Sequence, residues 1–384
     1  MAPVDASRIL PNTDNVRQLA SRMSKSEDNS QRDGSSAPCV GQASKPRGFL
    51  PEIRPISRTL RAQPWLLYGI YLFCLGTVMY VAGILMVFPR YIPGLFNLLT
   101  PVAEWLVWYS GMPMVLGLTL SLVDLLFLFE SKRPLRRYRE QPAIDSRVSV
   151  ALTAYNDEES VGEAVQDFLA HPRVTRVIVV SNNSADRTFE VAHAAGAITV
   201  NEDKPGYGRC VYRCYVEALR YTDTDFIVLC EGDRTFRAAD IDKLIAYAPH
   251  ADIVNGTRTV EALRQTRTQL TTFMFYGNFF VAKLLEAKHL GRSTLSDVGS
   301  TYKICRRDAM VALLPLLNPA INLEFNAHFM DVALASGLVL VECPITFHPR
   351  LGVSKGGNTS NTRALKVGLG MIRGLTFGWK RAAS

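Results

Sequence analysis

Residues Phe226 to Phe236 read Phe-Ile-Val-Leu-Cys-Glu-Gly-Asp-Arg-Thr-Phe, and this stretch decides the fold. Its first five residues are mostly bulky and apolar, as in a strand that is buried on both faces. Glu231 and Asp233 follow at the carboxyl end of that strand. Ligands bind at this edge of open α/β sheets, and two carboxylates one residue apart can hold a hard divalent cation. Taken alone, the pair is more typical of a solvated acidic turn than of a site, so the surrounding sequence has to decide.

Strands and helices alternate around this stretch. Strands are expected at 147–153, 174–180 and 198–200, and helices at 159–170, 185–194 and 209–221. Such an alternation predicts a mostly parallel sheet with right-handed crossovers. The predicted fold class is therefore α/β, with a Rossmann-like, mostly parallel sheet in a domain that spans residues 146–360.

Three loops at the expected strand ends are rich in polar residues or glycine. The first contains Tyr155 and Glu158, the second runs from Ser181 to Thr188, and the third contains Gly206 and Gly208. Ser, Asn and Asp at these places cap helices, which is a sufficient structural reason for each loop. Small residues also let backbone N–H groups approach a phosphate at a helix N-terminus. The loops therefore indicate either helix capping or a nucleotide pocket.

Two apolar runs precede this domain. Residues 65–88 carry no charge, and residues 105–129 contain Asp124 as their single charged residue. Because about 20 apolar residues span a bilayer, we predict two transmembrane helices, at about 65–88 and 105–129, within a segment that covers 63–131. Asp124 is expected to reach the membrane interface or to pair with a basic neighbour.

The distribution of basic residues predicts the orientation. Arginines and lysines flank the outer ends of the two runs, whereas the short loop between them has Arg90 as its only cation. The positive-inside rule then places both termini and the α/β domain in the cytoplasm. Residues 1–62 are polar with little apolar periodicity, so we expect a disordered cytoplasmic tail.

The charge balance and the C-terminal segment point to an anionic partner. The chain has 43 Lys and Arg against 35 Asp and Glu, a formal net charge of +8. No acidic residue follows Glu342, whereas seven basic ones do. Residues 361–384 are therefore predicted to form an amphipathic basic helix in the membrane interface. A C-terminal helix docked on the domain would explain the apolar face equally well.

The ordered motifs resemble those of family 2 glycosyltransferases, which have the GT-A fold. Within that family they are most similar to the dolichyl-phosphate-mannose-synthase-like branch, which transfers sugars to polyprenyl phosphates. The resemblance runs from about Val148 to Gly378. The segments that carry it are Ala154-Tyr155-Asn156-Asp157-Glu158, Asn182-Asn183-Ser184-Ala185-Asp186-Arg187-Thr188, Gly206-Tyr207-Gly208, Glu231-Gly232-Asp233 and Gly256-Thr257-Arg258.

The resemblance implies a donor site for a UDP- or GDP-linked sugar. Asn182 stands where the family has a base-reading Asp, which leaves the base open. Asp233 would be the principal ligand of Mg²⁺ or Mn²⁺, and Glu231 would contact the sugar side or help to hold the metal. The nucleotide-binding residues implied in this way are Ala154, Tyr155, Glu158, Asn182, Gly206 and Glu231.

The resemblance also implies an acceptor side in the second half of the domain. Asp297 and Glu324 join Asp233 as candidate catalytic residues. A lipid phosphate is already an anion and needs no general base, whereas a hydroxyl acceptor would give its proton to Asp297 or Glu324. The residues implied to contact phosphate or acceptor are Arg258, Arg350, Ser354 and Lys355.

The sequence thus predicts an integral membrane, inverting glycosyltransferase that moves a sugar from a nucleotide sugar to a polyprenyl phosphate of the dolichyl or undecaprenyl type. The alternatives are transfer to a glycolipid or protein hydroxyl, and a non-catalytic membrane scaffold with a degenerate transferase fold. The expected partners are the nucleotide sugar, the lipid and the membrane, with no nucleic acid. Homo-oligomerisation stays open.

Overall fold

The computed structural model describes residues 63–89, 92, 94, 96–132, 146–352 and 360–380. The predicted disordered tail 1–62 lies outside the described residues. So do two predicted phosphate-binding residues, Ser354 and Lys355.

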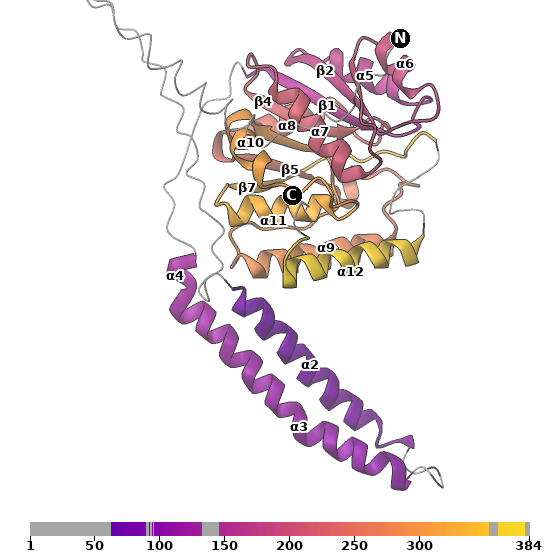
Figure 1. Ribbon diagram of the computed structural model, residues 1–384. Coiled ribbons are helices and arrows are strands. Elements are labelled where there is room, and N and C mark those ends of the chain that lie inside the picture. The colour runs from indigo at the N-terminus through magenta and orange to yellow at the C-terminus, as the bar shows by residue number, and fades with distance from the viewer. Residues whose placement is uncertain are drawn as a thin grey trace, which may run out of the picture.

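Within the described ranges, seven strands form one sheet in the order β3-β2-β1-β4-β6-β5-β7 (Figure 1). Strand β6 runs antiparallel to β4 and β5, and the other neighbouring pairs are parallel. This confirms the predicted α/β class with a mostly parallel sheet. The strands are β1 (Val148–Ala154), β2 (Val174–Ser181), β3 (Ile198–Asn201), β4 (Phe226–Glu231), β5 (Ile253–Thr257), β6 (Lys303–Arg306) and β7 (Leu340–Pro344).

Helices cover both faces of the sheet, and each face has its own apolar core. Successive side chains of a strand point to opposite faces. In β1, Val150 and Leu152 therefore enter one core, and Ala151 enters the other. The first core includes α5 (Val161–Leu169) and α8 (Asp240–Tyr247), with α6 (Thr188–Ala194) beside α5. The second includes α7 (Tyr207–Leu219), α10 (Arg307–Leu313) and α11 (Phe325–Ala335).

The register of the sheet brings the polar loops together. Thr153 in β1 lies opposite Val180 in β2 and opposite Glu231 in β4. Because these three strands are parallel, the loops that follow them leave from the same edge. The stretch that decides the fold therefore ends beside the two other polar loops.

Two long helices form a hairpin that extends away from this domain (Figure 1). They are α2 (Trp65–Leu85) and α3 (Phe96–Val123), the latter continued by a π-helical turn, η5 (Asp124–Leu128), and by α4 (Phe129–Lys132). By length and composition, both are able to cross a membrane. Large apolar side chains such as Trp108 and Phe127 are exposed on them, so these helices are not the core of a soluble domain.

The second of these helices, α3, begins at Phe96, earlier than the predicted residue 105, and includes Glu104. Pro101 and Pro113 both lie inside it. A proline removes one backbone donor, but membrane helices tolerate such breaks where neighbouring groups satisfy the backbone. The prolines therefore do not end the helix.

Glycines at seven-residue intervals let the two long helices α2 and α3 approach closely. A Cβ atom added to Gly69 would lie 2.5 Å from the carbonyl oxygen of Gly117, and one added to Gly76 would lie 2.6 Å from that of Ser110. Gly83 continues the row against Ala103. Small residues of this kind are what tight helix packing in a membrane requires.

Asp124 joins the two ends of the hairpin near the domain. Its side chain is 1% exposed, and its Oδ2 accepts a hydrogen bond from Leu66 N at 2.8 Å. Its Oδ1 forms an ion pair with Lys132, which also donates to the Gln63 carbonyl. The first N–H groups of a helix lack partners within the helix, so the carboxylate satisfies one of them. Asp124 therefore pairs with a basic neighbour, as predicted.

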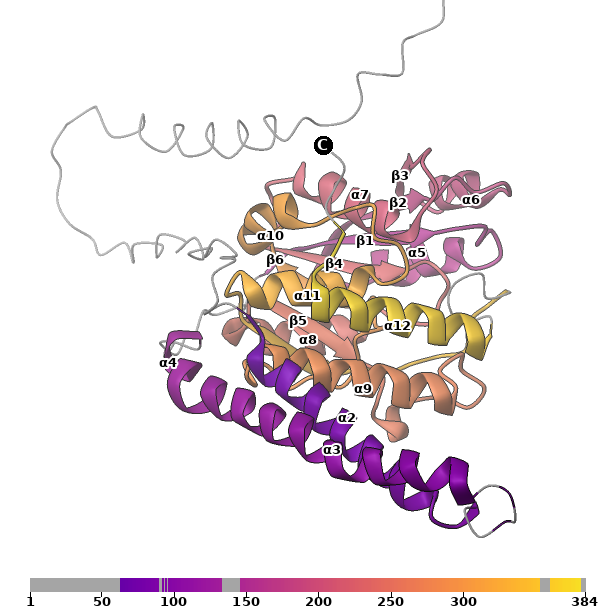
Figure 2. The same cartoon turned by 60° about the horizontal axis from the view of Figure 1, so that its bottom comes forward.

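Two helices lie side by side between the sheet domain and the hairpin (Figures 1 and 2). They are α9 (Thr272–Lys288) and α12 (Asn361–Phe377). Tyr68 of α2 donates to the Thr376 carbonyl at 3.0 Å, so α12 contacts the hairpin directly. Apolar side chains of both helices, including Tyr276 and Leu369, are exposed. The predicted C-terminal helix is thus formed over 361–377, and its place in a membrane interface stays a prediction.

Asp331 of α11 fixes the ends of these two helices. Its carboxylate accepts from Lys288 Nζ at 2.8 Å and lies 2.7 Å from His289 Nε2, at the end of α9. It also accepts from the Trp379 indole Nε1 at 2.7 Å, just after α12. One buried carboxylate therefore holds both helices against the sheet domain.

The glycine contact predicts a specific effect on the hairpin. Gly76→Ala should lower the melting temperature of the detergent-solubilised protein by several degrees, because the new methyl group meets the backbone of α3. Gly111→Ala is the matched control, since a Cβ atom there would have no neighbour within 4 Å. Equal melting temperatures for the two variants would contradict close packing at Gly76.

Candidate active site

A cavity of about 1010 Å³ lies between the carboxyl edge of the sheet and the helices α9 and α12. Loops that follow β1, β2, β3, β4 and β5 contribute to its wall, together with both helices. The structure therefore gathers most of the predicted site in one place. The predicted residues that line the cavity are Ala154, Tyr155, Asn182, Gly206, Glu231, Asp233, Arg258 and Arg350.

The acidic end of the cavity contains two buried carboxylates and one guanidinium group. Arg350 NH2 lies 2.5 Å from Asp157 Oδ1, and Arg350 NH1 lies 3.3 Å from Asp233 Oδ2. The other oxygen of Asp233 accepts from the backbone N and the hydroxyl of Thr235, at 3.0 and 2.6 Å. Asp157 lies within the first motif but is not among the predicted site residues. Its Oδ2 does accept from Tyr155 N at 3.0 Å.

The side chains at this end can carry a net negative charge that a cation would balance. Burial, with Glu231 nearby, raises the pKa of Asp233 to about 7. Burial also raises the pKa of Asp157, although Arg350 acts against it. When Asp157, Asp233 and Glu231 are ionised, three negative charges meet one positive charge, which leaves −2. Magnesium is commonly held by one or two carboxylates together with substrate phosphates. The donor set therefore fits a divalent cation, with Asp233 and Asp157 as its oxygen ligands.

In the part of the chain that the structure describes, no group of three or more His, Cys, Asp or Glu side chains is arranged to hold a metal ion unaided. The protein would thus supply only part of a coordination shell, and a bound diphosphate would supply the rest.

Glu231 is held by a chain of hydroxyl and amide groups. Its Oε1 accepts from Thr301 Oγ1 at 2.6 Å, and Thr301 Oγ1 lies 2.7 Å from the hydroxyl of Tyr207. Asn326 Nδ2 donates to that hydroxyl at 3.0 Å. Burial raises the pKa of Tyr207, so the phenol stays neutral and keeps its proton for this chain. These three residues come from distant segments and carry no motif, so the sequence did not mark them as supports for Glu231.

The nucleotide end is built by links between loops. Asn182 N donates to the Ala154 carbonyl at 2.8 Å, and its side-chain Oδ1 accepts from Gly206 N at 3.2 Å. Gly206 has a φ of 142°, a conformation that favours glycine. Glu158, predicted to bind nucleotide, lies exposed at the rim and accepts from Arg187 N at 3.0 Å. It is not part of the cavity wall.

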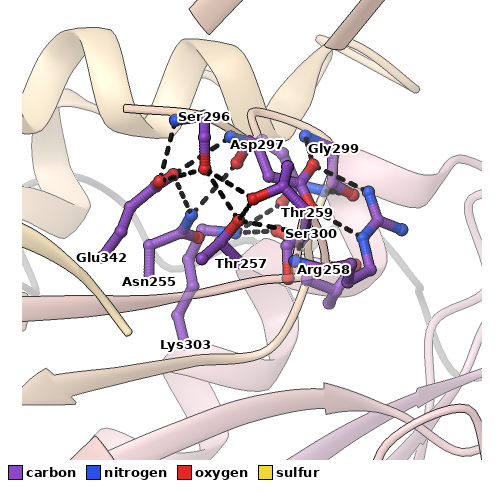
Figure 3. Close-up of polar contacts among 12 residues, drawn as sticks. Asn255, Thr257, Arg258, Thr259, Ser296, Asp297, Gly299, Ser300, Lys303 and Glu342 are labelled. Atoms are coloured by element: carbon purple, nitrogen blue, oxygen red, sulfur yellow. Dashed lines mark hydrogen bonds and ion pairs between the residues drawn. The ribbon is translucent and has the colours of Figure 1, made fainter. Parts of the chain in front are cut away.

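On the acceptor side, Asp297 and Arg258 form a buried bidentate ion pair (Figure 3). Arg258 Nε lies 2.7 Å from Oδ2 and NH2 lies 2.8 Å from Oδ1. The backbone N–H groups of Arg258 and Gly299 donate to the same carboxylate. Burial would raise the pKa of Asp297, but Arg258 and these donors bring it below its ordinary value. Asp297 is therefore poorly suited to accept a proton, and it holds Arg258 at the cavity wall.

Glu342 supports the turn that carries Asp297. Its two carboxylate oxygens accept from Ser296 N at 2.8 Å and from Asp297 N at 3.1 Å (Figure 3). Asn255 Nδ2 donates to the Asp297 carbonyl and to Glu342, each at 3.1 Å. The position of Arg258 thus depends on a network that extends to β7.

Glu324, the other candidate base, lies elsewhere. It caps α11 and is half-buried against α12, where a Cβ atom at Gly370 would lie 2.6 Å from its Oε1. It is not among the residues that line the cavity. Arg363 and Asn322 do line it, although neither was predicted.

The fold and site together define an α/β enzyme domain with an acidic, cation-compatible pocket at its sheet edge. Residues 149–314 match the family model described as Glycosyl transferase family 2. This match over residues 149–314 confirms the resemblance inferred from the motifs.

Several relatives align with about half of the chain. It is 28% identical over 211 residues to the Low-salt glycan biosynthesis hexosyltransferase Agl6 of Haloferax volcanii, covering 53% of this chain and 48% of that protein. It is 29% identical over 206 residues to the Uncharacterized glycosyltransferase Rv0539 of Mycobacterium tuberculosis, covering 53% and 87%. It is 25% identical over 209 residues to the Dolichyl-phosphate hexose transferase of Haloferax volcanii, covering 54% and 86%. The match thus spans about half the length of Agl6.

Among solved structures, the chain is similar to glucosyl-3-phosphoglycerate synthase from Mycobacterium tuberculosis in complex with Mn²⁺, UDP and glucosyl-3-phosphoglycerate. The identity is 17%, the TM-score is 0.47, and the alignment covers 62% of this chain and 82% of that one.

The buried ion pair predicts how the acceptor side responds to mutation. Arg258→Met should destabilise the protein by about 3–5 kcal/mol, because it leaves the Asp297 carboxylate buried without its partner. The double variant Arg258→Met with Asp297→Asn should recover much of that loss, since no uncompensated charge remains. Thermal unfolding of the three proteins measures this, and a single variant as stable as the original chain would contradict it.

Proposed function

We propose that this chain is a membrane-bound, inverting glycosyltransferase that moves a sugar from a nucleotide sugar to a polyprenyl phosphate at the cytoplasmic face of the membrane. The observation that carries the proposal is the continuity of one cavity. It has buried carboxylates at one end and the exposed apolar helices α9 and α12 at the other, beside the hairpin.

The acidic end suits the donor. Asp233 and Asp157 would hold Mg²⁺ or Mn²⁺, and Tyr155 and Asn182 would contact the base of a UDP- or GDP-linked sugar. When bound, the metal would supply Lewis-acid stabilisation of the diphosphate leaving group. Glu231, held by Thr301 on one oxygen, would present the other to the sugar.

The other end suits a lipid. Phe273, Phe280, Leu365 and Leu369 line the cavity there and are themselves exposed, so an isoprenoid chain could lie against them on its way from the bilayer. Arg258 and Arg363 in the same wall would attract an anionic head group, with Ser354 and Lys355 as further predicted contacts beyond the described residues. The similarity to a dolichyl-phosphate hexose transferase supports this class of acceptor.

The arrangement of carboxylates favours a phosphate acceptor over a hydroxyl. A hydroxyl must lose its proton to a nearby base. Asp297 is engaged by Arg258 and two backbone donors, and Glu324 lies outside the cavity wall. An acceptor that is already an anion needs neither. Asp297 would then position Arg258 rather than take a proton.

Transfer assays test the proposal directly. The full chain in proteoliposomes is incubated with Mn²⁺ and radiolabelled UDP- or GDP-sugars, with either undecaprenyl phosphate or undecaprenol. We expect a lipid-linked product with the phosphate and none with the alcohol. Asp233→Ala should reduce the rate by at least about 100-fold, because the charge on the leaving group loses its stabilisation. Asp242 is an exposed acidic residue of α8 outside the cavity wall, so Asp242→Ala should retain the rate of the original chain.

Other outcomes point to the alternatives. A product with undecaprenol as the better acceptor would contradict the phosphate assignment and favour transfer to a hydroxyl. A protein that binds no nucleotide sugar would contradict the enzyme and favour a scaffold.

A further inference from the structure

The acidic end of the cavity contains a cation that the chain itself provides. The guanidinium of Arg350 contacts Asp157 at 2.5 Å and Asp233 at 3.3 Å, so it lies between the two carboxylates that fit a divalent metal. All three side chains are largely buried, with 13%, 7% and 3% of their surfaces exposed, respectively. Burial lowers the pKa of Arg350, but the charges of Asp233, Asp157 and Glu231 more than offset this, so it remains protonated.

Backbone contacts bring Arg350 to this place. His348 N donates to the Thr235 carbonyl at 2.9 Å, and Leu351 N donates to the Asp233 carbonyl at 3.4 Å. The segment around Arg350 is therefore joined to the acidic loop on both sides of the residue. These contacts hold the backbone on both sides of Arg350, and a long side chain can adopt several staggered rotamers from one backbone position.

The contact is less complete than the other arginine ion pair at the cavity. Arg258 uses both Nε and NH2 on Asp297, and that carboxylate also accepts from two backbone N–H groups. Arg350 instead divides its two terminal nitrogens between two acids, and its buried Nε has no hydrogen-bond partner among the described residues. An unpaired buried donor weakens an arrangement of this kind. The ion pair of Arg258 is thus complete, whereas the contacts of Arg350 leave one of its donors unpaired.

We propose that Arg350 is an exchangeable internal cation of Asp157 and Asp233. In the donor-free protein it occupies the place of the divalent metal, and it moves to the diphosphate when metal and nucleotide bind together. The inference rests on the metal and nucleotide site proposed above. It gives Arg350 a second position.

Charge balance explains why metal and nucleotide should bind together. A divalent cation alone would neutralise the two carboxylates but would leave the Arg350 guanidinium buried without a partner. A diphosphate alone would meet two carboxylates of its own sign. When both bind, the two carboxylates bind the metal. The Arg350 guanidinium then binds the diphosphate through paired hydrogen bonds to phosphate oxygens. Each ligand should therefore strengthen the binding of the other by the same factor.

Titration with Mn²⁺, followed by electron paramagnetic resonance, measures this coupling without turnover. The full chain in detergent micelles is titrated alone and in the presence of UDP or GDP. In the original chain, the nucleoside diphosphate should tighten Mn²⁺ binding at least about tenfold, within the usual range for coupled sites. In Arg350→Gln, Mn²⁺ alone should bind at least about tenfold more tightly, and the coupling should fall towards one.

Three further variants complete the experiment. Arg220→Gln makes the same change of charge at an exposed residue of the α7 C-cap, outside the cavity wall, and should bind Mn²⁺ like the original chain. Asp157→Asn should weaken Mn²⁺ binding with and without nucleotide. If Arg350→Gln does not fold, as judged by its melting curve, Arg350→Lys keeps the charge but loses the fork and should show an intermediate coupling.

The outcomes separate this inference from the proposed function. If Arg350→Gln weakens nucleotide binding but binds Mn²⁺ alone no better than the original chain, Arg350 is only a phosphate ligand and the inference is overturned. If neither the original chain nor any variant binds Mn²⁺, even with nucleotide, the proposed metal site is wrong. Both this inference and the proposed function are then contradicted.

Discussion

The burial of Asp233 at the carboxyl end of β4 is the constraint on which the site depends. A carboxylate that is 2% exposed must be matched by donors or by positive charge, and Thr235 and Arg350 provide both. To deliver Arg350, the chain that follows β7 crosses the sheet edge and pairs its backbone with the acidic loop. These backbone hydrogen bonds join the segment after β7 to the loop after β4.

Two arginines at the cavity perform different tasks because their surroundings differ. Arg258 is fixed by a bidentate pair with Asp297, which Glu342 and Asn255 hold from behind. Arg350 forms ion pairs with both Asp157 and Asp233, and a divalent cation could bind the same two carboxylates. The fixed arginine faces the proposed acceptor, and the exchangeable one faces the proposed diphosphate. This division lets a single cavity treat two anionic substrates differently.

The sequence was sufficient for the features that depend on local composition. The buried strand with Glu231 and Asp233, the alternation that makes the sheet mostly parallel and the two long apolar helices all follow from short-range patterns. The contact of Asp157 with Arg350 joins residues 193 positions apart, and no periodicity encodes it. The support of Glu231 by Thr301, Tyr207 and Asn326 likewise arises only when four segments pack together. Helix α3 begins before residue 105 because it includes Glu104, a charge at which an uncharged apolar run ends.

The central claim is that a nucleotide sugar and a lipid phosphate share one cavity, and photolabelling tests it most directly. A polyprenyl phosphate with a diazirine close to its phosphate is irradiated with the full chain in proteoliposomes, and the labelled peptides are mapped by mass spectrometry. The account predicts labels on α9 and α12, within 272–288 and 361–377, that excess unlabelled polyprenyl phosphate removes and excess polyprenol does not. Labels confined to the hairpin helices α2 and α3, unchanged by either competitor, would contradict it.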